Sequence, residues 1–447
     1  MSFTELPKHW EVARHSEIAQ INPKLPFQNI DDETEVSFIP MKLVAEERNI
    51  IQLTEFRKYG EVKKGFTSFT NGDVIFAKIT PCMENGKGAV VRDLRNRIGF
   101  GSTEFHVSRP KSNVLPEFIF YFLVQQTFRR LAESNMTGSV GQKRVPTQFF
   151  RDFEIPLPPL AEQQRIVAKL EELFSELDAG LASLKTAAQQ LKTYRQAVLK
   201  WAFEGKLTND HANEGELPAG WKWEKLGEIT KIIGGVTKGR DFKGKKTIFL
   251  PYLRVANVQD GYLDLKEVKT IEALPSDKDK YALAPGDILY TEGGDKDKLG
   301  RGTIWKNEIG GCIHQNHIFR ARPISAEIDS KYIAYFSGTK SAKNYFFKHG
   351  KQTTNLASIN LTVLSNLPIP LCSLEEQHRI VQEIESRLSV CDKLEETLAG
   401  SLRQAEALRQ SILKQAFAGK LVAPEESDKL QFVAGSRNSP FAETSTN

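Results

Sequence analysis

Two stretches of the chain carry apolar residues at alternating steps of four and three, with polar residues between them. This spacing is the a/d pattern of a helix that packs along another long helix. Neither stretch contains proline, and each follows a proline-containing segment that excludes a helix. We therefore predict two helices, each about 45 residues and about 70 Å long, that pack on one another as a rod.

The predicted seam of the first helix is formed by Leu170, Phe174, Leu177, Leu181, Leu184, Leu191 and Val198. The seam of the second helix is formed by Ile384, Leu388, Leu398, Leu402 and Ile412. Arg195 and Arg409 interrupt the two seams at the same slot, and polar seam residues usually fix the register or orientation of paired helices. Gly205 and Gly419 then suit a left-handed helix stop. The alternative, in which each helix packs separately on its own neighbouring domain, stays open.

The second of these stretches repeats the first. Residues 155–207 and 369–421 align with a shift of 214 positions and no gap, and 23 of the 53 pairs are identical. The same shift relates landmarks outside the helices, such as Asn71–Phe76 and Pro285–Tyr290. A repeat that keeps its register over this length indicates a duplicated structural unit. The chain is therefore predicted to hold a globular domain followed by a long helix, twice, as an internal pseudo-twofold repeat.

Each globular half contains short apolar segments between Gly, Asn and Pro residues, which is typical of strands. The predicted strands are Val36–Met41, Asp73–Lys78, Gly88–Arg92, Glu104–Ser108, Phe249–Val255, Asp287–Glu292, Gly302–Lys306 and His317–Arg322. One amphipathic helix is predicted per half, at Pro116–Glu133 and Ser330–Lys348. The fold class is therefore α+β, with two mixed bodies that each hold a curled sheet.

The repeat also predicts the domain boundaries. The globular domains are predicted at 1–158 and 208–372, and the helices at 159–207 and 373–422. The polar, aperiodic tail at 423–447 is predicted to be disordered. The residues between the shared landmarks hardly match, so the two bodies are expected to bind two different targets of one kind.

The composition limits the class of protein. With 447 residues the chain is long enough for two or three domains, and no apolar run approaches the ~18 residues of a membrane span. The four cysteines are scattered, and the N-terminus has no signal-peptide core, which suits a cytoplasmic location. A net charge of +5 permits a polyanionic partner without requiring one.

The sequence carries no catalytic or cofactor-binding motif that we recognise. The glycine-rich segment Gly234–Gly239 lacks the spacing and the closing residues of a phosphate-binding loop. Cys312, His314 and His317 approach zinc-ligand spacing, but no fourth ligand lies nearby in the sequence. We therefore predict no catalytic residue, no metal and no bound cofactor in this chain.

Basic and polar residues gather in Gly-, Ser- and Thr-rich loops at matching places in the two halves. Small residues let a backbone approach a phosphate, Lys and Arg neutralise it, and Gln and Asn can contact base edges. Each cluster alone is more often a solvated loop, but their recurrence in both halves favours nucleic-acid binding. The predicted DNA-binding residues are Lys78, Lys87, Ser139, Gln142, Lys143, Arg144, Lys238, Arg240, Lys296, Arg301, Lys351, Gln352, Thr353 and Asn355.

The duplicated segments resemble those of the specificity subunit of type I restriction-modification enzymes. The resemblance rests on Ile155–Val167 with its copy Ile369–Val381, and on the closing segments Ala202–Leu207 and Ala416–Leu421. The strand starts at Gly72-Asp73 and Gly286-Asp287 are similar to those of the family's target recognition domains. The resemblance covers residues 1–422.

The resemblance implies a division of labour. Each target recognition domain would read one half of a split, asymmetric double-stranded DNA site. The helices would pair as an antiparallel coiled coil that sets the unread gap and docks two modification subunits. Those subunits would carry S-adenosylmethionine and methylate adenines. Two restriction subunits would use ATP and Mg to translocate and cut, and this chain would have no catalytic activity of its own.

Two other functions are compatible with parts of the sequence. A structural adaptor would carry two protein-binding domains on a coiled coil, and it would show no steep salt dependence of duplex binding. An autonomous methyltransferase or nuclease would require cofactor motifs that we do not find.

Overall fold

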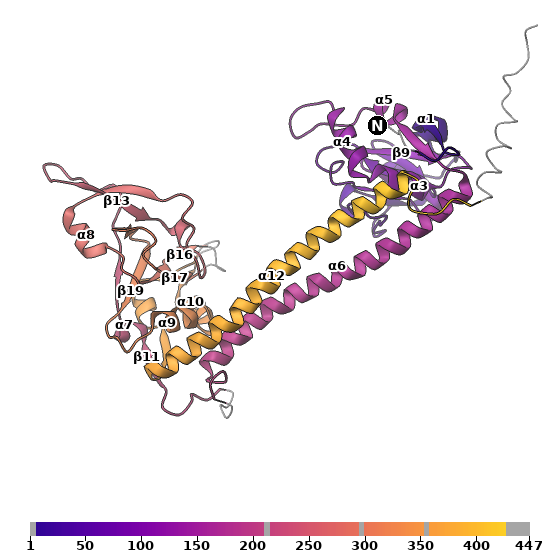
Figure 1. Cartoon of the computed structure of the whole chain (residues 1–447). Coiled ribbons are helices and arrows are strands. Elements are labelled where there is room, and N and C mark those ends of the chain that lie inside the picture. Colours follow the sequence, from indigo (N-terminus) through magenta and orange to yellow (C-terminus); the bar gives the residue numbers. More distant parts are fainter. Residues whose placement is uncertain (1–5, 210–214, 295–298, 353–356, 426–447) are drawn as a thin grey trace, which may run out of the picture. The chain divides into compact units, whose positions relative to one another are not determined.

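The computed structural model describes residues 6–209, 215–294, 299–352 and 357–425 (Figure 1). Its contacts divide the chain into two units. The first unit contains residues 1–184 and 400–447, and the second contains residues 185–399. Most of the predicted disordered tail, residues 426–447, lies outside the described residues. In the described residues, no helix is long and apolar enough to cross a membrane.

The first unit is built on two four-stranded sheets. One is antiparallel and has the order β2 (Ala19–Ile21), β9 (Phe105–Pro110), β6 (Val74–Ala77) and β7 (Gly88–Val90). The other has the order β4 (Phe56–Lys58), β3 (Glu35–Ile39), β8 (Ile98–Gly101) and β5 (Thr67–Thr70), with β3 and β8 parallel. A short ladder joins β1 (Glu11–Arg14) to β10 (Glu154–Leu157).

The second unit repeats this topology. Its four-stranded sheet has the order β12 (Thr230–Gly234), β19 (Ile318–Pro323), β15 (Ile288–Thr291) and β17 (Gly302–Ile304). A three-stranded sheet places β13 (Ile248–Leu253) between antiparallel β14 (Lys269–Ala273) and parallel β18 (Ile313–His314). The ladder β11 (Lys222–Lys225) with β22 (Pro368–Leu371) matches β1 with β10. All eight predicted strands overlap observed strands, and the mixed α+β class is confirmed.

The units differ in two places: the sheet of β13 has no described counterpart of β5, and the second unit has a small sheet where the first unit has the isolated bridges of Arg144 with Ile79 and Thr137. In the second unit, β21 (Ala357–Ser358) lies between β16 (Gly293–Gly294) and β20 (Lys351–Gln352). The described short helices are α1 (His15–Ile18), α2 (Tyr59–Val62), α5 (Thr147–Asp152), α7 (Leu226–Ile229), α8 (Pro275–Tyr281) and α11 (Leu361–Ser365), with 3-10 turns at Met41–Leu43, Arg95–Arg97 and Val255–Asn257.

The single amphipathic helix predicted in each half is wrong, because each is two helices. In the first unit α3 (Pro116–Leu123) is followed by α4 (Gln126–Ser134), and in the second α9 (Ser330–Ser337) is followed by α10 (Lys340–His349). The backbone before α4 and α10 is extended, at Gln125 and Thr339. Thr339 caps α10, since its hydroxyl accepts a hydrogen bond from the Ala342 amide. The apolar periodicity continues through both breaks and therefore hides them.

The two long helices are confirmed as α6 (Leu160–Phe203) and α12 (Leu374–Phe417), each of 44 residues. In the first unit the early part of α6 meets the late part of α12, where Arg409 contacts Asp178 and lies 4.3 Å from the Phe174 ring centre. In the second unit the late part of α6 meets the early part of α12, where Arg195 Nε lies 3.1 Å from Glu395 Oε1. The helices therefore pair antiparallel within each unit (Figure 1).

The predicted seam positions are buried or half-buried along the two helices. Leu170, Phe174, Leu181, Leu191, Val198, Ile384 and Ile412 are buried. Leu177, Leu184, Leu388, Leu398 and Leu402 are half-buried. The two seam arginines form equivalent ion pairs across the helices. Arg195 contacts Asp392, and its repeat counterpart Arg409 contacts Asp178, which is the repeat counterpart of Asp392.

Each long helix ends in the unit opposite to the one in which it starts. The Phe203 ring at the end of α6 lies 5.0 Å from Tyr332 and 5.1 Å from Phe336, in the second unit. The Phe417 ring at the end of α12 lies 4.9 Å from Phe118 and 5.3 Å from Phe122, in the first unit. The glycines that follow have positive φ, 75° at Gly205 and 67° at Gly419, as predicted for a helix stop.

The repeated glutamine near each helix start fastens the helix to its own globular body. Gln163 Oε1 accepts a hydrogen bond from the Leu115 amide at 3.0 Å, and its Nε2 donates to Pro158 O at 2.9 Å. Gln377 makes the same two bonds, from Asp329 N and to Cys372 O. The repeated helix-start motif is therefore explained by bonds inside the chain.

The repeated Gly-Asp strand start also has a structural role. Asp73 is buried, and its two carboxylate oxygens accept hydrogen bonds from Arg109 at 2.7 and 2.8 Å. Asp287 is buried in the same way and pairs with Arg322 at 2.6 and 2.7 Å. Each pair links the residue just before a central strand, β6 or β15, to the end of the neighbouring strand, β9 or β19.

Replacing Asp73 with asparagine should lower the free energy of unfolding by about 2–4 kcal/mol, because the Arg109 guanidinium loses its buried carboxylate. The measurement is the denaturant midpoint of the full chain. Asp93 is exposed, and Asp93→Asn serves as the control, with an expected change within about 0.5 kcal/mol. Equal midpoints for the two variants would contradict this role of Asp73.

Candidate nucleic-acid interface

The predicted residues of the first half gather around the end of strand β6. Lys78 follows this strand, and its amide donates to Glu104 O at 2.9 Å. Lys87 lies beside it, since the Ala77 amide donates to Lys87 O at 2.8 Å. The loop that carries Ser139, Gln142, Lys143 and Arg144 reaches the same place, because the Thr80 amide donates to Lys143 O at 3.0 Å.

This loop is a narrow, exposed hairpin. Thr137 and Arg144 exchange two backbone hydrogen bonds of 3.0 and 2.8 Å. Gly138 has a φ of 123°, and a Cβ there would meet Gln142 O at 2.9 Å, so only glycine fits without strain. At the tip Val140 is 96% exposed. The hairpin therefore presents small and basic residues, together with backbone amide groups, to solvent.

Arg144 does not project freely from the hairpin. Its guanidinium forms a double hydrogen bond with Glu104, with Nε–Oε2 at 2.9 Å and Nη2–Oε1 at 2.8 Å. The hydrogen bond from Arg144 lowers the pKa of Glu104, and partial burial opposes this shift. Lys143 is exposed. The cluster thus offers hydrogen-bond donors at Lys78 and Lys143 and a fixed ion pair of Arg144 with Glu104.

The second unit has the same backbone arrangement at the end of β15. The Glu292 amide donates to His317 O at 2.9 Å, and the Ile359 amide donates to Glu292 O at 2.7 Å. The Thr291 amide donates to Arg301 O, so Arg301 occupies the place of Lys87. The Arg301 side chain donates to Gln259 Oε1 at 2.8 Å.

The remaining predicted residues of the second half are dispersed. Lys351 and Gln352 are exposed on β20, next to the end of β15 through β21 and β16. Lys238 and Arg240 lie in the loop after β12, where Arg240 pairs with Asp277 of α8 and lowers the pKa of that carboxyl. Lys296, Thr353 and Asn355 lie outside the described residues.

Sequence reasoning missed three residues at these strand ends, namely Glu104, Glu292 and His317. Cations and amides are the usual DNA contacts, so a sequence pattern gives no reason to select a carboxylate. The repeat could have indicated Glu292, because this residue aligns with the predicted residue Lys78 when the sequence is shifted by 214 positions. His317 matches Glu104 only with a shift of 213, since one residue is lost between the strands.

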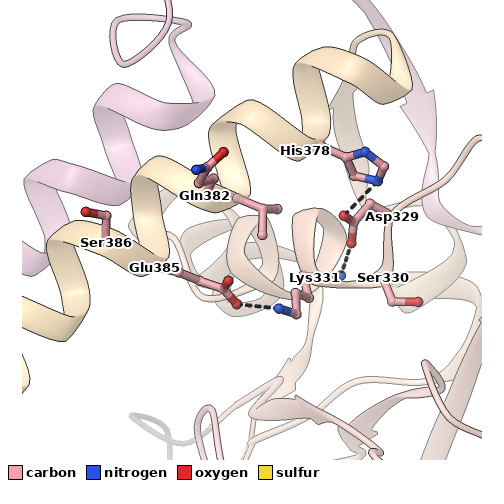
Figure 2. A pocket seen from close by; sticks show the side chains of 8 residues that line it. Asp329, Ser330, Lys331, His378, Gln382, Glu385 and Ser386 are labelled. Atoms are coloured by element: carbon pink, nitrogen blue, oxygen red, sulfur yellow. Dashed lines mark hydrogen bonds and ion pairs between the residues drawn. The ribbon is translucent and has the colours of Figure 1, made fainter.

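A groove in the second unit has a different character. It lies between the start of α9 and one face of α12 (Figure 2). Lys331 Nζ lies 2.7 Å from Glu385, and His378 lies 3.5 Å from the Asp329 carboxylate. These charged groups are paired with one another across the groove, so they fasten α12 to α9. Among the described residues, no group of three or more His, Cys, Asp or Glu side chains is placed to hold a metal ion.

The comparisons with known proteins agree with this architecture. The family model described as type I restriction modification DNA specificity domain matches residues 7–184 and 218–404. The specificity subunit of the type I restriction enzyme EcoEI of Escherichia coli is 30% identical over 497 residues, which cover 92% of this chain and 83% of that protein. The EcoAI specificity subunit of the same species is 29% identical and covers 87% and 79%.

Solved structures give the same result. A chain from a structural study of complex assembly and conformational transition of the type I R-M system aligns with a TM-score of 0.73 and 25% identity, over 93% of this chain and 99% of that one. The HsdS subunit of Thermoanaerobacter tengcongensis shares the fold, with a TM-score of 0.57 and 23% identity over 93% and 98%. The two matched segments are the two halves of the repeat, and this chain belongs to the DNA specificity subunits of type I restriction-modification systems.

Proposed function

We propose that each unit reads one half of a split, asymmetric site on double-stranded DNA. The observation that carries the proposal is the strand-end cluster, which has one backbone arrangement in both units and different side chains in each. A shared frame supports two readers of one kind of target, and different side chains support two different half-sites. The paired helices would set the unread gap between the half-sites.

The partners follow from this role. The long helices would dock two modification subunits, which would supply S-adenosylmethionine and methylate adenines in the site. Two restriction subunits would supply ATP hydrolysis with Mg and cut the DNA. This chain would contribute sequence recognition and geometry and would carry out no chemical step.

The decisive experiment assembles the full chain with its modification subunit on a library of random duplexes. Methylated adenines are then mapped by sequencing. The expected motif has two unlike half-sites separated by a gap of fixed length. If methylation shows no sequence preference, or if the two half-sites are identical, the proposal is wrong.

Lys143→Ala should weaken duplex binding and reduce the salt dependence. One lost phosphate contact lowers the slope of log K against log salt by about 0.9. The measurement is the duplex affinity of the full chain over a series of salt concentrations. Lys111 is exposed at the opposite end of β9, which makes Lys111→Ala the matched control. Equal slopes for the two variants would remove Lys143 from the interface, and a slope near zero for the unmodified chain would favour a protein-binding adaptor.

A further inference from the structure

The ends of β6 and β15 make the same backbone hydrogen bonds, but their side chains have opposite roles, one as a donor and one as an acceptor. At the end of β6, Lys78 N donates to Glu104 O, and Lys78 O accepts from Val145 N. At the end of β15, Glu292 makes the same two bonds with His317 and Ile359. One backbone position therefore carries a lysine in the first unit and a glutamate in the second.

The surroundings make this difference larger. In the first unit Arg144 binds Glu104 through both carboxylate oxygens, which pairs this carboxylate and leaves ammonium groups, among them that of Lys78, as donors at the strand end. In the second unit the position of Arg144 in the ladder belongs to Ser358, which pairs with Gly293. Glu292 instead has His317 Nδ1 at 2.5 Å from its Oε2.

The frame around the two positions is the same. The opposite end of each strand is held by an equivalent ion pair. This pair is Asp73–Arg109 at the start of β6 and Asp287–Arg322 at the start of β15. The two positions therefore share their backbone bonds and the Asp–Arg pairs and differ in the side chains at the strand end. The side chains of Glu292 and His317 are 34% and 52% exposed, so both can reach a ligand.

We propose that this strand-end position selects opposite base edges in the two half-sites, with Lys78 selecting a guanine and Glu292 selecting a cytosine. This inference rests on the proposed DNA-reading function. Lysine donates to the O6 and N7 acceptors of guanine in the major groove, whereas a carboxylate accepts from the N4 amino group of cytosine. His317 engages Oε2 of Glu292 and so holds the carboxylate in place, while Oε1 accepts from the base.

A carboxylate is costly in a DNA interface unless a donor meets it. Phosphates and the acceptor atoms of guanine and thymine repel it, and an unpaired charge loses its hydration there. Glu292 therefore acts both by accepting from cytosine and by rejecting bases that present only acceptors at this place. Lys78 has the reverse preference.

The test uses the full chain in complex with its modification subunit and maps methylated adenines on random duplexes. For Glu292→Lys we expect one position of the second half-site to change from cytosine to guanine, with discrimination altered about ten- to hundredfold. Lys78→Glu should produce the reverse change in the first half-site. Neither variant should alter the half-site of the other unit.

Glu308 supplies the control. Glu308 is exposed and follows β17, whose end lies next to the start of β15, at the far side of the sheet from Glu292. Glu308→Lys should leave the motif unchanged. If Glu292→Lys retains methylation with an unchanged second half-site, the proposal is overturned, and it is equally overturned if Glu308→Lys alters the same position.

If Glu292→Lys abolishes all methylation, a second variant tests the proposal. Glu292→Gln has the same shape and can both accept and donate, so it should relax the cytosine requirement while methylation continues. A strict cytosine in Glu292→Gln would overturn the proposal. Failure of the unmodified complex to show any sequence preference would instead reject the proposed function itself, so the two failures are distinguishable.

Discussion

Phe417→Ala should destabilise the first unit, and Phe203→Ala should destabilise the second. Phe417 is 6% exposed and lies against Phe118 and Phe122, so its removal leaves a cavity beside α3. Phe203 is 8% exposed and lies against Tyr332 and Phe336 beside α9. Truncation of a buried phenylalanine typically costs about 3–5 kcal/mol, which is a large part of the stability of one domain.

Hydrogen exchange measured segment by segment separates the two effects. Phe417→Ala should speed exchange mainly in α3 and the sheets of residues 1–158, although residue 417 is far from them in sequence. Phe203→Ala should speed exchange mainly in residues 218–372. Leu408 is 50% exposed on α12, and Leu408→Ala should change stability by less than about 0.5 kcal/mol.

The reverse assignment would contradict the crossed arrangement. If Phe417→Ala loosened α9 and β15 and spared α3, the end of α12 would not belong to the first unit. Uniform loosening of both units by either variant would also contradict it, because each phenylalanine contacts one unit in this structure.

The repeat made most of the fold predictable. Proline-free heptads predicted α6 and α12 to within a few residues, because a seam such as Leu170, Phe174 and Leu181 is typical of a long helix that packs along another helix. Short apolar segments such as Val74–Ala77 were predicted as strands because glycine and asparagine bracket them. The seam arginines indicated fixed register, and each meets an aspartate of the other helix.

The sequence could not reveal which side chains meet across the fold. Arg144 and Glu104 are 40 residues apart, and nothing in either local pattern indicates that they pair. Arg240 was grouped with the other cations because it lies in a basic loop, yet it pairs with Asp277. The breaks at Gln125 and Thr339 depend on backbone angles, which apolar periodicity does not encode.

Because the helix ends cross, each half of the repeat carries an apolar surface that the other half covers. A fragment of residues 1–214 would keep α3 without Phe417 and the end of α6 without Tyr332 and Phe336. Each of these two exposed surfaces is the repeat counterpart of the partner that the other surface has lost. Phe203 matches Phe417 in the repeat, and Phe118 matches Tyr332. Exposed apolar helix faces of this kind drive association.

We therefore expect the 1–214 fragment to form a symmetric dimer in solution. Phe203 of one copy would lie against Phe118 of the other, and Arg195 would meet Asp178, the repeat counterpart of Asp392. The measurement is the mass by sedimentation equilibrium. Val198→Asp within the fragment is the control, because a buried carboxylate in the seam should keep the fragment monomeric.

With the modification subunit, such a dimer should methylate a palindromic site made of the first half-site and its inverse. The reason is that both copies would present the same Lys78 and Lys143 cluster, related by a twofold axis, whereas the full chain carries two different clusters. A folded fragment that stays monomeric, or a dimer that still methylates the asymmetric motif of the full chain, would contradict the equivalence of the two halves. The asymmetry of the natural motif would then have to arise from the helices and not from the strand-end clusters.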